Sequence, residues 1–207
     1  MSTRILLIDD HPLFRRGVAQ LLAAEPDLEV VGEAGDGESG IHLAATLLPD
    51  VILLDLNMKG MDGLETLRKL KAGGVQSRCI MLTVSGDEQH VLSAVKSGAD
   101  GYLLKDMEPE ELVRSVRQSM VGGVVLDGAV AGILAQALNA PQPPERTSLT
   151  ERESQILAQL AEGRCNKEIA RLLGISDATV KVHIKHLLRK LNMKSRLEAA
   201  VWALHNL

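Results

Sequence analysis

The sequence predicts two domains of different class, a doubly wound, five-stranded parallel α/β domain followed by a smaller all-α domain. In the first half, short apolar runs such as Ile5–Ile8 and Val51–Leu54 alternate with segments of helical periodicity, which is typical of buried parallel strands joined by helices. From about residue 147 the chain has helix-capping patterns and no strand pattern. Between the halves lies Pro141–Gln142–Pro143–Pro144, whose prolines forbid helix and favour an extended spacer.

Each strand expected in the first half is a short apolar run. We expect strands near residues 4–8, 29–34, 51–54, 79–83 and 101–104. Helices are expected between these strands and after the last one. The final helix of this half opens with Glu108–Pro109, because proline is favoured in a first helical turn.

Four helices are expected in the second half, each from its N-terminal signal. Residues 150–153 have the sequence Thr-Glu-Arg-Glu, a capping box that opens the first helix. Asn166 is the expected cap of the second helix, which stops near Gly174, and Ser176 is the expected cap of the third. Residues 195–198, Ser-Arg-Leu-Glu, form another capping box that opens the fourth.

These elements predict the domain boundaries. We expect the α/β domain over residues 1–122 and the helical domain over 147–207. Residues 123–146 are expected to be a linker that contains a short helix in the Ala- and Leu-rich stretch Asp127–Leu138.

The charge differs between the two halves. Residues 145–207 contain eleven Lys or Arg and seven acids, a net +4, whereas residues 1–144 carry −8. An acidic half joined to a basic half indicates an anionic partner for the basic one.

The chain has no apolar run near the length needed to span a bilayer and no signal-peptide pattern, so we expect a cytoplasmic protein that does not contact membranes. Its two cysteines, Cys79 and Cys165, make neither a disulfide framework nor a metal site.

Acidic, hydroxyl and amine side chains occur where four of the expected strands end. Asp9 and Asp10 come after the first strand, Asp55 after the third, Thr83 at the end of the fourth and Lys105 after the fifth. Side chains just past the carboxyl ends of parallel strands converge in one crevice. A single acid at such a position would be interpreted as a helix cap, and a single lysine as a solvated loop residue. Five such positions together predict a shared pocket.

Three carboxylates in one pocket raise each other's pKa unless a cation joins them. Mg²⁺ prefers oxygen ligands, binds through one or two carboxylates and keeps positions open for a phosphoryl group. The pocket therefore predicts a phosphoryl-transfer site in which an aspartate accepts the phosphoryl group.

An enzyme is an alternative, because aspartyl phosphates are also catalytic intermediates. Such an enzyme needs an acid or base near the nucleophile and a cavity for its substrate. Asn57, two residues after Asp55, offers no acid, so the phosphoryl group is better interpreted as a signal and the protein as a non-enzyme.

A nicotinamide enzyme is a more distant alternative. Residues 35–40, Gly-Asp-Gly-Glu-Ser-Gly, match GxGxxG, follow a strand and open a helix, and Asp55 lies about twenty residues on, as a dinucleotide site requires. However, this motif lies in the second βα unit, and the chain lacks a second mononucleotide-binding half. The glycines are better interpreted as a turn and a helix start.

The segment 176–191 has an apolar face and a basic face. The apolar face repeats with helical spacing and consists of Val180, Ile184, Leu187, Leu188 and Leu191. Lys181, Lys185 and Arg189 lie on another face, with Val182 beside them. A tight turn at Gly174 precedes this helix, so the pair forms a helix-turn-helix whose basic second helix suits the major groove of DNA.

Several side chains of this helix are candidates for contact with double-stranded DNA. Lysines bind phosphates or guanine edges, and an exposed valine can meet a thymine methyl group. A solvated surface is the alternative for a lysine row, but the turn, the caps and the domain charge favour DNA. The candidates are Thr179, Lys181, Val182, Lys185 and Arg189.

Four segments of the first half, ILLIDDHP, DVILLDLNMKGMDGLETL, MLTVS and GADGYLLKD, resemble the receiver domain of bacterial two-component response regulators, which has a flavodoxin-like fold. The resemblance implies that Asp55 is the phosphoacceptor for a sensor histidine kinase. It also implies that Mg²⁺ is bound by Asp9, Asp10, Asp55 and the backbone carbonyl of Asn57.

The same resemblance assigns three switch residues and shows one departure. Thr83 matches the switch hydroxyl, Tyr102 the switch aromatic, and Lys105 the lysine that pairs with the phosphoryl group. The family usually has proline where this chain has Lys59, which places an additional positive charge beside the site.

The segment LTERESQILAQLAEGRCNKEIARLLGISDATVKVHIKHLLRKLNMKSRLEAAVW resembles the LuxR-type DNA-binding domain. A receiver followed by this domain is typical of the NarL/FixJ class of response regulators. GYLLKDMEPEEL and TVKVHIKHLLRKLNMKSRLEAAVW are most similar to its nitrate/nitrite-responsive members. A regulator of the same class with a different stimulus is the alternative.

The resemblance also implies how the protein is regulated. The unphosphorylated, acidic receiver would cover the face formed by Lys181, Lys185 and Arg189. Phosphorylation of Asp55 would relieve this occlusion and promote dimeric DNA binding, which would activate or repress genes of nitrate- or nitrite-responsive anaerobic respiration.

Overall fold

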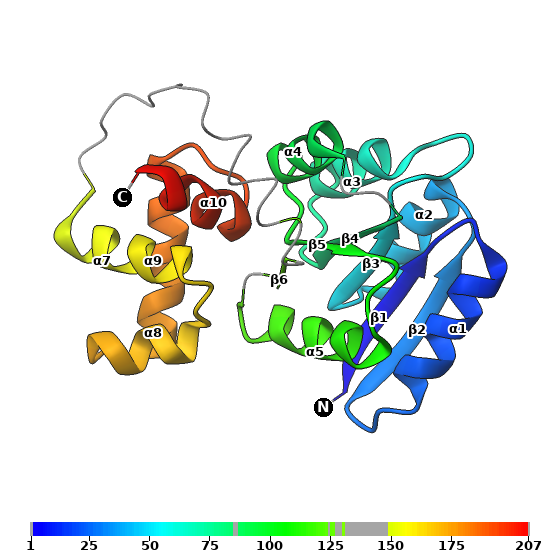
Figure 1. The fold of residues 1–207 in the computed structure, drawn as a ribbon, viewed down its shortest axis with the longest axis horizontal. Coiled ribbons are helices and arrows are strands. Elements are labelled where there is room, and N and C mark those ends of the chain that lie inside the picture. The colour runs from blue at the N-terminus through cyan, green and yellow to red at the C-terminus, as the bar shows by residue number, and fades with distance from the viewer. Residues whose placement is uncertain (1, 85–86, 124, 127–129, 131–148, 207) are drawn as a thin grey trace.

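The computed structural model describes residues 2–84, 87–123, 125, 126, 130 and 149–206 (Figure 1). An α/β part and a helical part lie side by side in this structure. Pro141–Gln142–Pro143–Pro144 and all but one residue of the short helix expected within the linker lie outside the described residues. Among the residues that are described, no helix combines the length and apolar character needed to cross a membrane.

The sheet has six parallel strands in the order β2-β1-β3-β4-β5-β6. The first five are the expected ones, each within a residue of its predicted start and end: β1 Thr3–Ile8, β2 Leu28–Ala34, β3 Val51–Asp55, β4 Arg78–Thr83 and β5 Gly101–Leu104. The sixth, β6 Val125–Leu126, extends the sheet beyond the prediction. Two residues are too few to show a strand pattern in the sequence.

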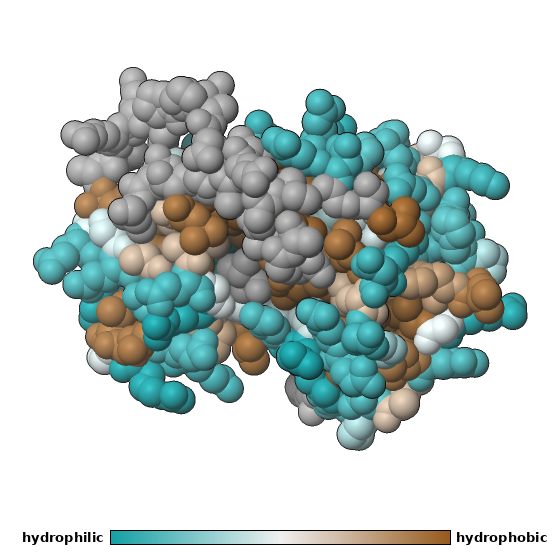
Figure 2. Space-filling model, in the orientation of Figure 1, coloured by the Kyte–Doolittle hydropathy of each residue, from teal (hydrophilic) through white to brown (hydrophobic). Residues whose placement is uncertain are grey.

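Both faces of the sheet are buried under helices, and alternate residues of each strand point to opposite faces. Ile5 and Leu7 pack with α1 (Pro12–Ala23) and α5 (Pro109–Met120). Leu6 and Ile8 pack on the other face, which is covered by α2 Gly37–Leu47, α3 Gly63–Ala72 and α4 Glu88–Lys96. On the surface of the described residues in Figure 2, hydrophilic residues predominate and apolar residues occur in separate patches.

The helical part contains the four expected helices, α7 Glu151–Ala161, α8 Asn166–Leu173, α9 Asp177–Lys190 and α10 Arg196–Asn206. The Thr150 capping box is confirmed, and so is the Ser176 cap, whose hydroxyl accepts a hydrogen bond from the Thr179 N–H at 3.1 Å. Gly174 ends α8 with φ +65°, a conformation that suits glycine.

Two of the expected caps differ from the prediction. Cys165 is the N-cap of α8 and Asn166 is its first helical residue; the Asn166 amide oxygen instead accepts a hydrogen bond from Arg196 at 2.8 Å. At α10 the Ser195 hydroxyl accepts from the Glu198 N–H as expected, but the Glu198 carboxylate accepts from the Lys194 N–H rather than from that of Ser195. Tertiary partners and the neighbouring turn compete with local capping at both places.

A partly buried ion pair links α7 to α9. Lys190 Nζ lies 2.6 Å from Glu153 Oε2, and the Glu153 side chain is 5% exposed. The hydrogen bond from Lys190, together with those from Thr150, lowers the pKa of Glu153 to about 2 from its ordinary 4.5. Because the folded-state pKa is depressed, this carboxylate stabilises the domain fully above about pH 4.5, and the stabilisation is lost as the pH falls towards 2.

We therefore expect Glu153→Gln to destabilise the helical part by about 1–2 kcal/mol at pH 7, and the difference from the unsubstituted chain to vanish near pH 2. Trp202 is the only tryptophan and packs against the core of this part, so its fluorescence reports on the unfolding of this part. Glu151→Gln, an exposed acid in the first turn of the same helix, is the matched control. A loss of stability in Glu153→Gln that is constant between pH 7 and pH 2 would contradict the assignment.

The helix α10 lies between the two parts of the molecule (Figure 1). On one side, Ala199 and Ala203 pack in the core formed with α7 and α9. On the other side, Leu197 and Val201 belong to the apolar cluster of the sheet and α4, and both are at most 1% exposed. The α/β part therefore contacts the helical part chiefly through α10.

Close backbone approaches surround this contact. A Cβ atom added to Gly122, at the end of α5, would lie 2.8 Å from Asn166 Nδ2 and 3.0 Å from Arg196 Nη1. One added to Gly98, after α4, would lie 3.6 Å from the Lys194 Cβ. The two parts thus touch with little free space between them.

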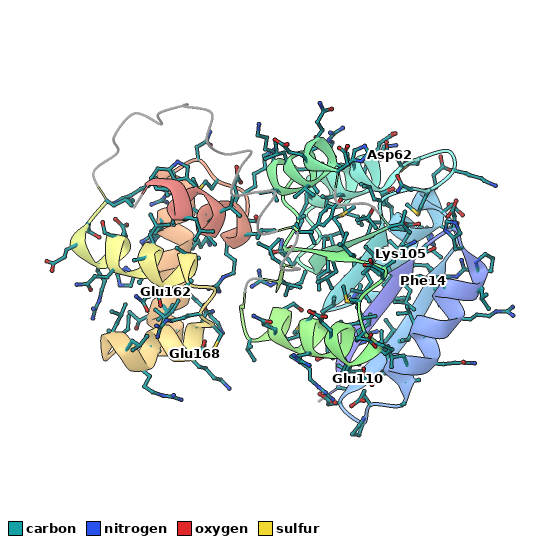
Figure 3. All side chains as sticks on the ribbon, viewed as in Figure 1. Phe14, Asp62, Lys105, Glu110, Glu162 and Glu168 are labelled. Carbon is teal, nitrogen blue, oxygen red and sulfur yellow. The ribbon has the colours of Figure 1, made fainter. Side chains whose placement is uncertain are left out.

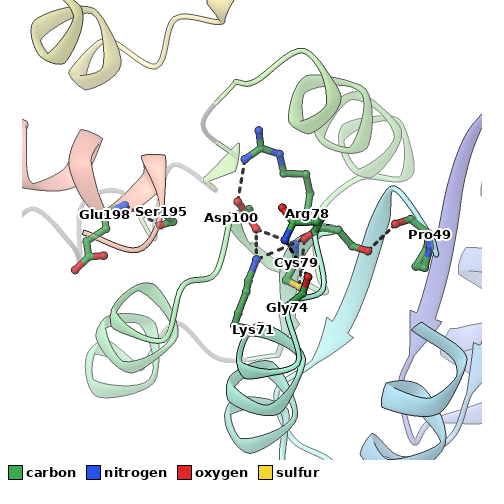
Figure 4. A network of polar contacts seen from close by, with 10 residues as sticks. Pro49, Lys71, Gly74, Arg78, Cys79, Asp100, Ser195 and Glu198 are labelled. Carbon is green, nitrogen blue, oxygen red and sulfur yellow. Dashed lines mark hydrogen bonds and ion pairs between the residues drawn. The ribbon is translucent and has the colours of Figure 1, made fainter. Parts of the chain in front are cut away.

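Cationic side chains lie at the edge of the contact. Lys71 and Arg78 both pair with Asp100, at 2.8 and 3.0 Å, and Figure 4 shows this cluster near the start of α10. Arg196 is 4% exposed. Burial lowers the pKa of Arg196 to about 10, and the positive charge of Arg78 lowers it as well. Apolar packing therefore stabilises the contact, and repulsion between like charges weakens it.

Candidate functional site

The order of the strands brings the predicted acidic pocket together. β1 lies between β2 and β3, and the crevice at their carboxyl ends lies where the strand order reverses. Asp9 and Asp10 leave β1 there, and Asp55 ends β3 beside them. Asp9 is 3% exposed and Asp55 is 1% exposed, so two carboxylates are almost fully withdrawn from water.

Lys105 joins the two buried carboxylates. Its Nζ lies 2.8 Å from Asp9 Oδ2 and 2.9 Å from Asp55 Oδ2. The Lys105 N–H donates to the Thr83 carbonyl at 2.7 Å, which fixes the backbone that carries the lysine. The ammonium group also lies 4.7 Å from the centre of the Phe14 ring, which limits its access to water (Figure 3). The structure thus places Lys105 where the sequence predicted it.

Burial raises the pKa of Asp55 above its ordinary value. The hydrogen bond from Lys105 opposes this effect, whereas the negative charge of Asp9 adds to it. A second cation in the pocket would therefore favour the ionised form of the carboxyl group.

The loop after β3 completes the pocket. The Asn57 N–H donates to Asp55 Oδ1 at 3.2 Å, and the Lys59 N–H donates to Asp10 Oδ2 at 3.1 Å. Proline at position 59 could not make the second bond, because it has no N–H. Gly63 lets α3 pack on this strand, since a Cβ there would lie 2.1 Å from the Asp55 carbonyl oxygen. Lys59 therefore restrains Asp10 through its backbone as well as adding charge.

His11 is a member of the pocket that the sequence analysis did not single out. Its Nδ1 lies 2.9 Å from Asp10 Oδ1, 3.5 Å from Asp9 Oδ1 and 3.7 Å from Asp55 Oδ2. A ligand atom from each of these four residues lies within 4.8 Å of the others. Its position next to two aspartates was the signal in the sequence, but adjacency does not reveal where a side chain points.

Thr83 and Tyr102 lie together behind the pocket. The register pairs Asp55 with Leu82, so Thr83 follows just beyond the end of β3, and Thr83 and Tyr102 are both 0% exposed. Burial raises the pKa of Tyr102 to about 12, and a hydrogen bond with the Thr83 side chain opposes that rise. The two predicted switch residues are thus directly coupled.

The pocket fits a divalent cation. Asp9 Oδ2, Asp10 Oδ1 and Asp55 Oδ2 are buried, and Lys105 and His11 reach them as ion-pair partners. Clustered carboxylate oxygens are the ligands that a hard cation prefers.

The glycine motif at residues 35–40 is accounted for by packing. Asp36 caps α2 by accepting a hydrogen bond from the Ser39 N–H. A Cβ on Gly37 would lie 2.2 Å from Thr66 Oγ1, and one on Gly40 would lie 2.5 Å from Ile8. The glycines allow α2 to approach α3 and β1 closely, which supports the interpretation as a turn and a helix start.

The predicted DNA-contacting residues share one exposed face of α9. Lys181, Val182, Lys185 and Arg189 are exposed, and Val182 is 53% exposed although it is apolar. Lys181 pairs with Asp177 at 2.9 Å, one turn earlier. The Thr179 hydroxyl lies 2.8 Å from that of Ser176, at the start of the helix. The opposite face packs inward through Val180, Ile184 and Leu187.

The predicted occlusion of this face is not seen in the arrangement of this structure. The face is exposed, and the α/β part contacts α10 instead. Charge attraction between an acidic and a basic surface has no preferred orientation, whereas the arrangement in this structure buries the apolar side chains of Leu197 and Val201.

Two family models match the chain. The response regulator receiver domain matches residues 5–117, and the luxR family of bacterial regulatory proteins matches residues 147–203. Among the curated relatives, the nitrate/nitrite response regulator protein NarL of Escherichia coli K12 is 54% identical over 96% of this chain and 93% of its own length. The nitrate/nitrite response regulator NarP of the same organism is 50% identical over 96% and 93%.

A more distant relative and a solved structure cover both parts. The transcriptional regulatory protein LiaR of Bacillus subtilis is 42% identical over 98% of this chain and 97% of its own. The crystal structure of the response regulator ChrA, from a haem-sensing two-component system, is 37% identical with a TM-score of 0.55, and the match covers 99% of this chain and 98% of that one.

Proposed function

Because the chain belongs to the NarL/FixJ class of two-component response regulators, with a receiver domain and a LuxR-type DNA-binding domain, we propose that phosphorylation of Asp55 controls DNA binding by α9. The observation that carries this proposal is the convergence of Asp9, Asp55 and Lys105 within 2.9 Å contacts at the carboxyl ends of the strands. We propose 1–122 as the receiver, 123–146 as the linker and 147–207 as the DNA-binding domain.

Asp55 is the nucleophile in this proposal. Its ionised carboxylate attacks the phosphoryl group carried by a histidine of a sensor kinase, so that a P–O bond forms as the P–N bond breaks. Lys105, already 2.9 Å from Asp55 Oδ2, then binds an oxygen of the transferred group. Thr83 donates its hydroxyl hydrogen to another, which alters its hydrogen bond with Tyr102.

Asp9, Asp10, Asp55 and the carbonyl of Asn57 would hold Mg²⁺ beside the acceptor. The ion supplies positive charge that neutralises the phosphoryl oxygens. The Lys59 N–H restrains the Asp10 carboxylate in this pocket by donating a hydrogen bond to it.

We propose nitrate or nitrite as the stimulus, through a membrane sensor kinase. The support comes from two relatives named as nitrate/nitrite response regulators, which are 54% and 50% identical to this chain. A binding survey of the phosphorylated protein across promoters would test the assignment. Enrichment at genes unrelated to anaerobic respiration would favour a different stimulus for the same class of regulator.

The contact through α10 replaces occlusion as the proposed form of regulation. Receiver docking buries Leu197 and Val201. When the domains separate, these apolar side chains become exposed and favour pairing with a second copy, which places two α9 helices on two half-sites. The positive charge of Arg78 near Arg196 opposes this docked state.

DNA readout by α9 gives a direct test. We expect Lys185→Ala to weaken operator binding roughly tenfold and Val182→Ala to lose about 1 kcal/mol of discrimination at a thymine. The measurement is a titration across operator variants at fixed salt. Lys96→Ala, which removes an exposed lysine at the end of α4, is the control and should leave both quantities unchanged. Wild-type affinity and sequence preference in both α9 variants would show that another surface reads the DNA.

A further inference from the structure

His11 is held against the acidic pocket by its local backbone. It precedes Pro12, which begins α1, and it has the extended conformation φ −91°, ψ 101° that a residue before proline favours. Its own N–H donates to Asp9 Oδ1 at 2.8 Å. Its side chain does not cap the helix, so the imidazole is free to turn towards the carboxylates.

The distances from His11 are close to those between adjacent ligands of one metal ion. With metal–ligand bonds of about 2.0–2.2 Å, adjacent ligand atoms lie roughly 3.0–3.5 Å apart in octahedral or tetrahedral geometry. His11 Nδ1 lies 2.9, 3.5 and 3.7 Å from an oxygen of Asp10, Asp9 and Asp55. One ion could therefore contact the nitrogen and all three carboxylates after small side-chain movements.

The nitrogen changes which ions the pocket prefers. Mg²⁺ binds oxygen ligands, whereas imidazole suits zinc, nickel, copper and iron, and cobalt and manganese accept both kinds of ligand. We propose that His11 is a metal ligand of the receiver and that its Nδ1, with Asp9, Asp10 and Asp55, forms a mixed nitrogen–oxygen site for divalent d-block ions. This proposal rests on the acidic pocket being the receiver's metal site, and it adds a ligand and an ion class to that site.

The pocket has space for such an ion and its water ligands. A cavity of about 400 Å³ opens beside the carboxylates and is lined by His11, Asp10, Lys59 and His90, among others. His11 has a side chain that is 65% exposed, so it can adjust to an ion without disturbing the core. Because a d-block ion would occupy the same carboxylates as Mg²⁺, the two compete for Asp55.

The comparison of His11→Ala with His90→Ala tests the proposal on the full chain. His90 lines the same cavity but is not one of the four residues whose ligand atoms cluster. Bound Mn²⁺ is measured by electron paramagnetic resonance, and competition against it gives the affinities of Mg²⁺ and Co²⁺. Pulsed measurements are made on bound Mn²⁺, and the Mn²⁺ in this site is identified as the fraction that added Mg²⁺ can displace. They detect coupling between this ion and a directly bound nitrogen.

We expect nitrogen coupling in the wild type and in His90→Ala, and none in His11→Ala. Co²⁺ affinity should fall at least roughly tenfold in His11→Ala, whereas Mg²⁺ affinity should change by less than about twofold. Bound Mn²⁺ without nitrogen coupling in the wild type would overturn the role of His11 and leave the magnesium site standing. Equal losses of Mg²⁺ and Co²⁺ affinity would overturn it as well. If Mn²⁺ bound to none of the three proteins, both the role of His11 and the metal site itself would be refuted.

Discussion

Replacing Asp55 with Asn is expected to abolish Mg²⁺-dependent phosphorylation of the chain by a small-molecule phosphodonor or by its kinase. A carboxamide lacks the anionic oxygen that attacks phosphorus, and it removes one of the three carboxylates that would hold the ion. The variant should remain folded, since the substitution removes the repulsion from Asp9 that raises the pKa of Asp55. The measurement is incorporation of the phosphoryl group, followed by mass spectrometry of the intact chain.

Asp106→Asn is the matched control for this substitution. Asp106 is exposed and follows Lys105 directly, so the control makes the same chemical change one residue beyond the pocket. It should be phosphorylated like the wild type. Undiminished phosphorylation of Asp55→Asn would require a different acceptor.

Replacing Gly122 with Asn is expected to separate the two domains without phosphorylation. A Cβ at this position would lie 2.8 Å from Asn166 Nδ2 and 3.0 Å from Arg196 Nη1, so these two side chains, which are almost fully buried and hydrogen-bonded to each other, would have to shift. Gly122 has φ +78°, which asparagine tolerates better than other side chains, so the main effect falls on the contact between domains. If domain separation and DNA binding are coupled by about 1–3 kcal/mol, the operator affinity of the unphosphorylated chain should rise about 5–150-fold.

Gly74→Asn serves as the control for backbone strain. Gly74 has φ +75° but nothing within 4 Å of an added Cβ, so it reproduces the conformational cost without the collision. Small-angle scattering should show a larger radius of gyration for Gly122→Asn than for Gly74→Asn, and only the former should bind operator more tightly. Identical scattering and affinity in the two variants would contradict a regulatory contact at α10.

The strands and the acidic pocket were predictable because they follow from short-range patterns. Continuous apolar runs such as Val51–Leu54 are needed wherever both faces of a sheet are covered, and parallel strands bring their carboxyl ends to one edge. The contacts of Lys105 with Asp9 and Asp55, residues about 100 and 50 positions away in the chain, therefore followed from topology alone.

Other features depend on tertiary packing and were not predictable from one sequence. The direction of the His11 imidazole depends on how Pro12 and Asp9 fix its backbone. Asparagine is a residue type that favours helix caps, but the Asn166 amide oxygen accepts a hydrogen bond from Arg196, 30 residues later in the chain. The side of α10 that meets the receiver is apolar in the sequence at Leu197 and Val201, but the sequence does not say which surface buries it.

Operator binding by the full chain, measured at one salt concentration with and without a phosphodonor and Mg²⁺, tests the central claim most directly. The duplex would be one selected from a random pool by the phosphorylated protein. Phosphorylation should raise the affinity of the wild type by about 5–150-fold and leave that of Asp55→Asn unchanged. An equal rise in both proteins, or no rise in the wild type, would contradict control of DNA binding through Asp55.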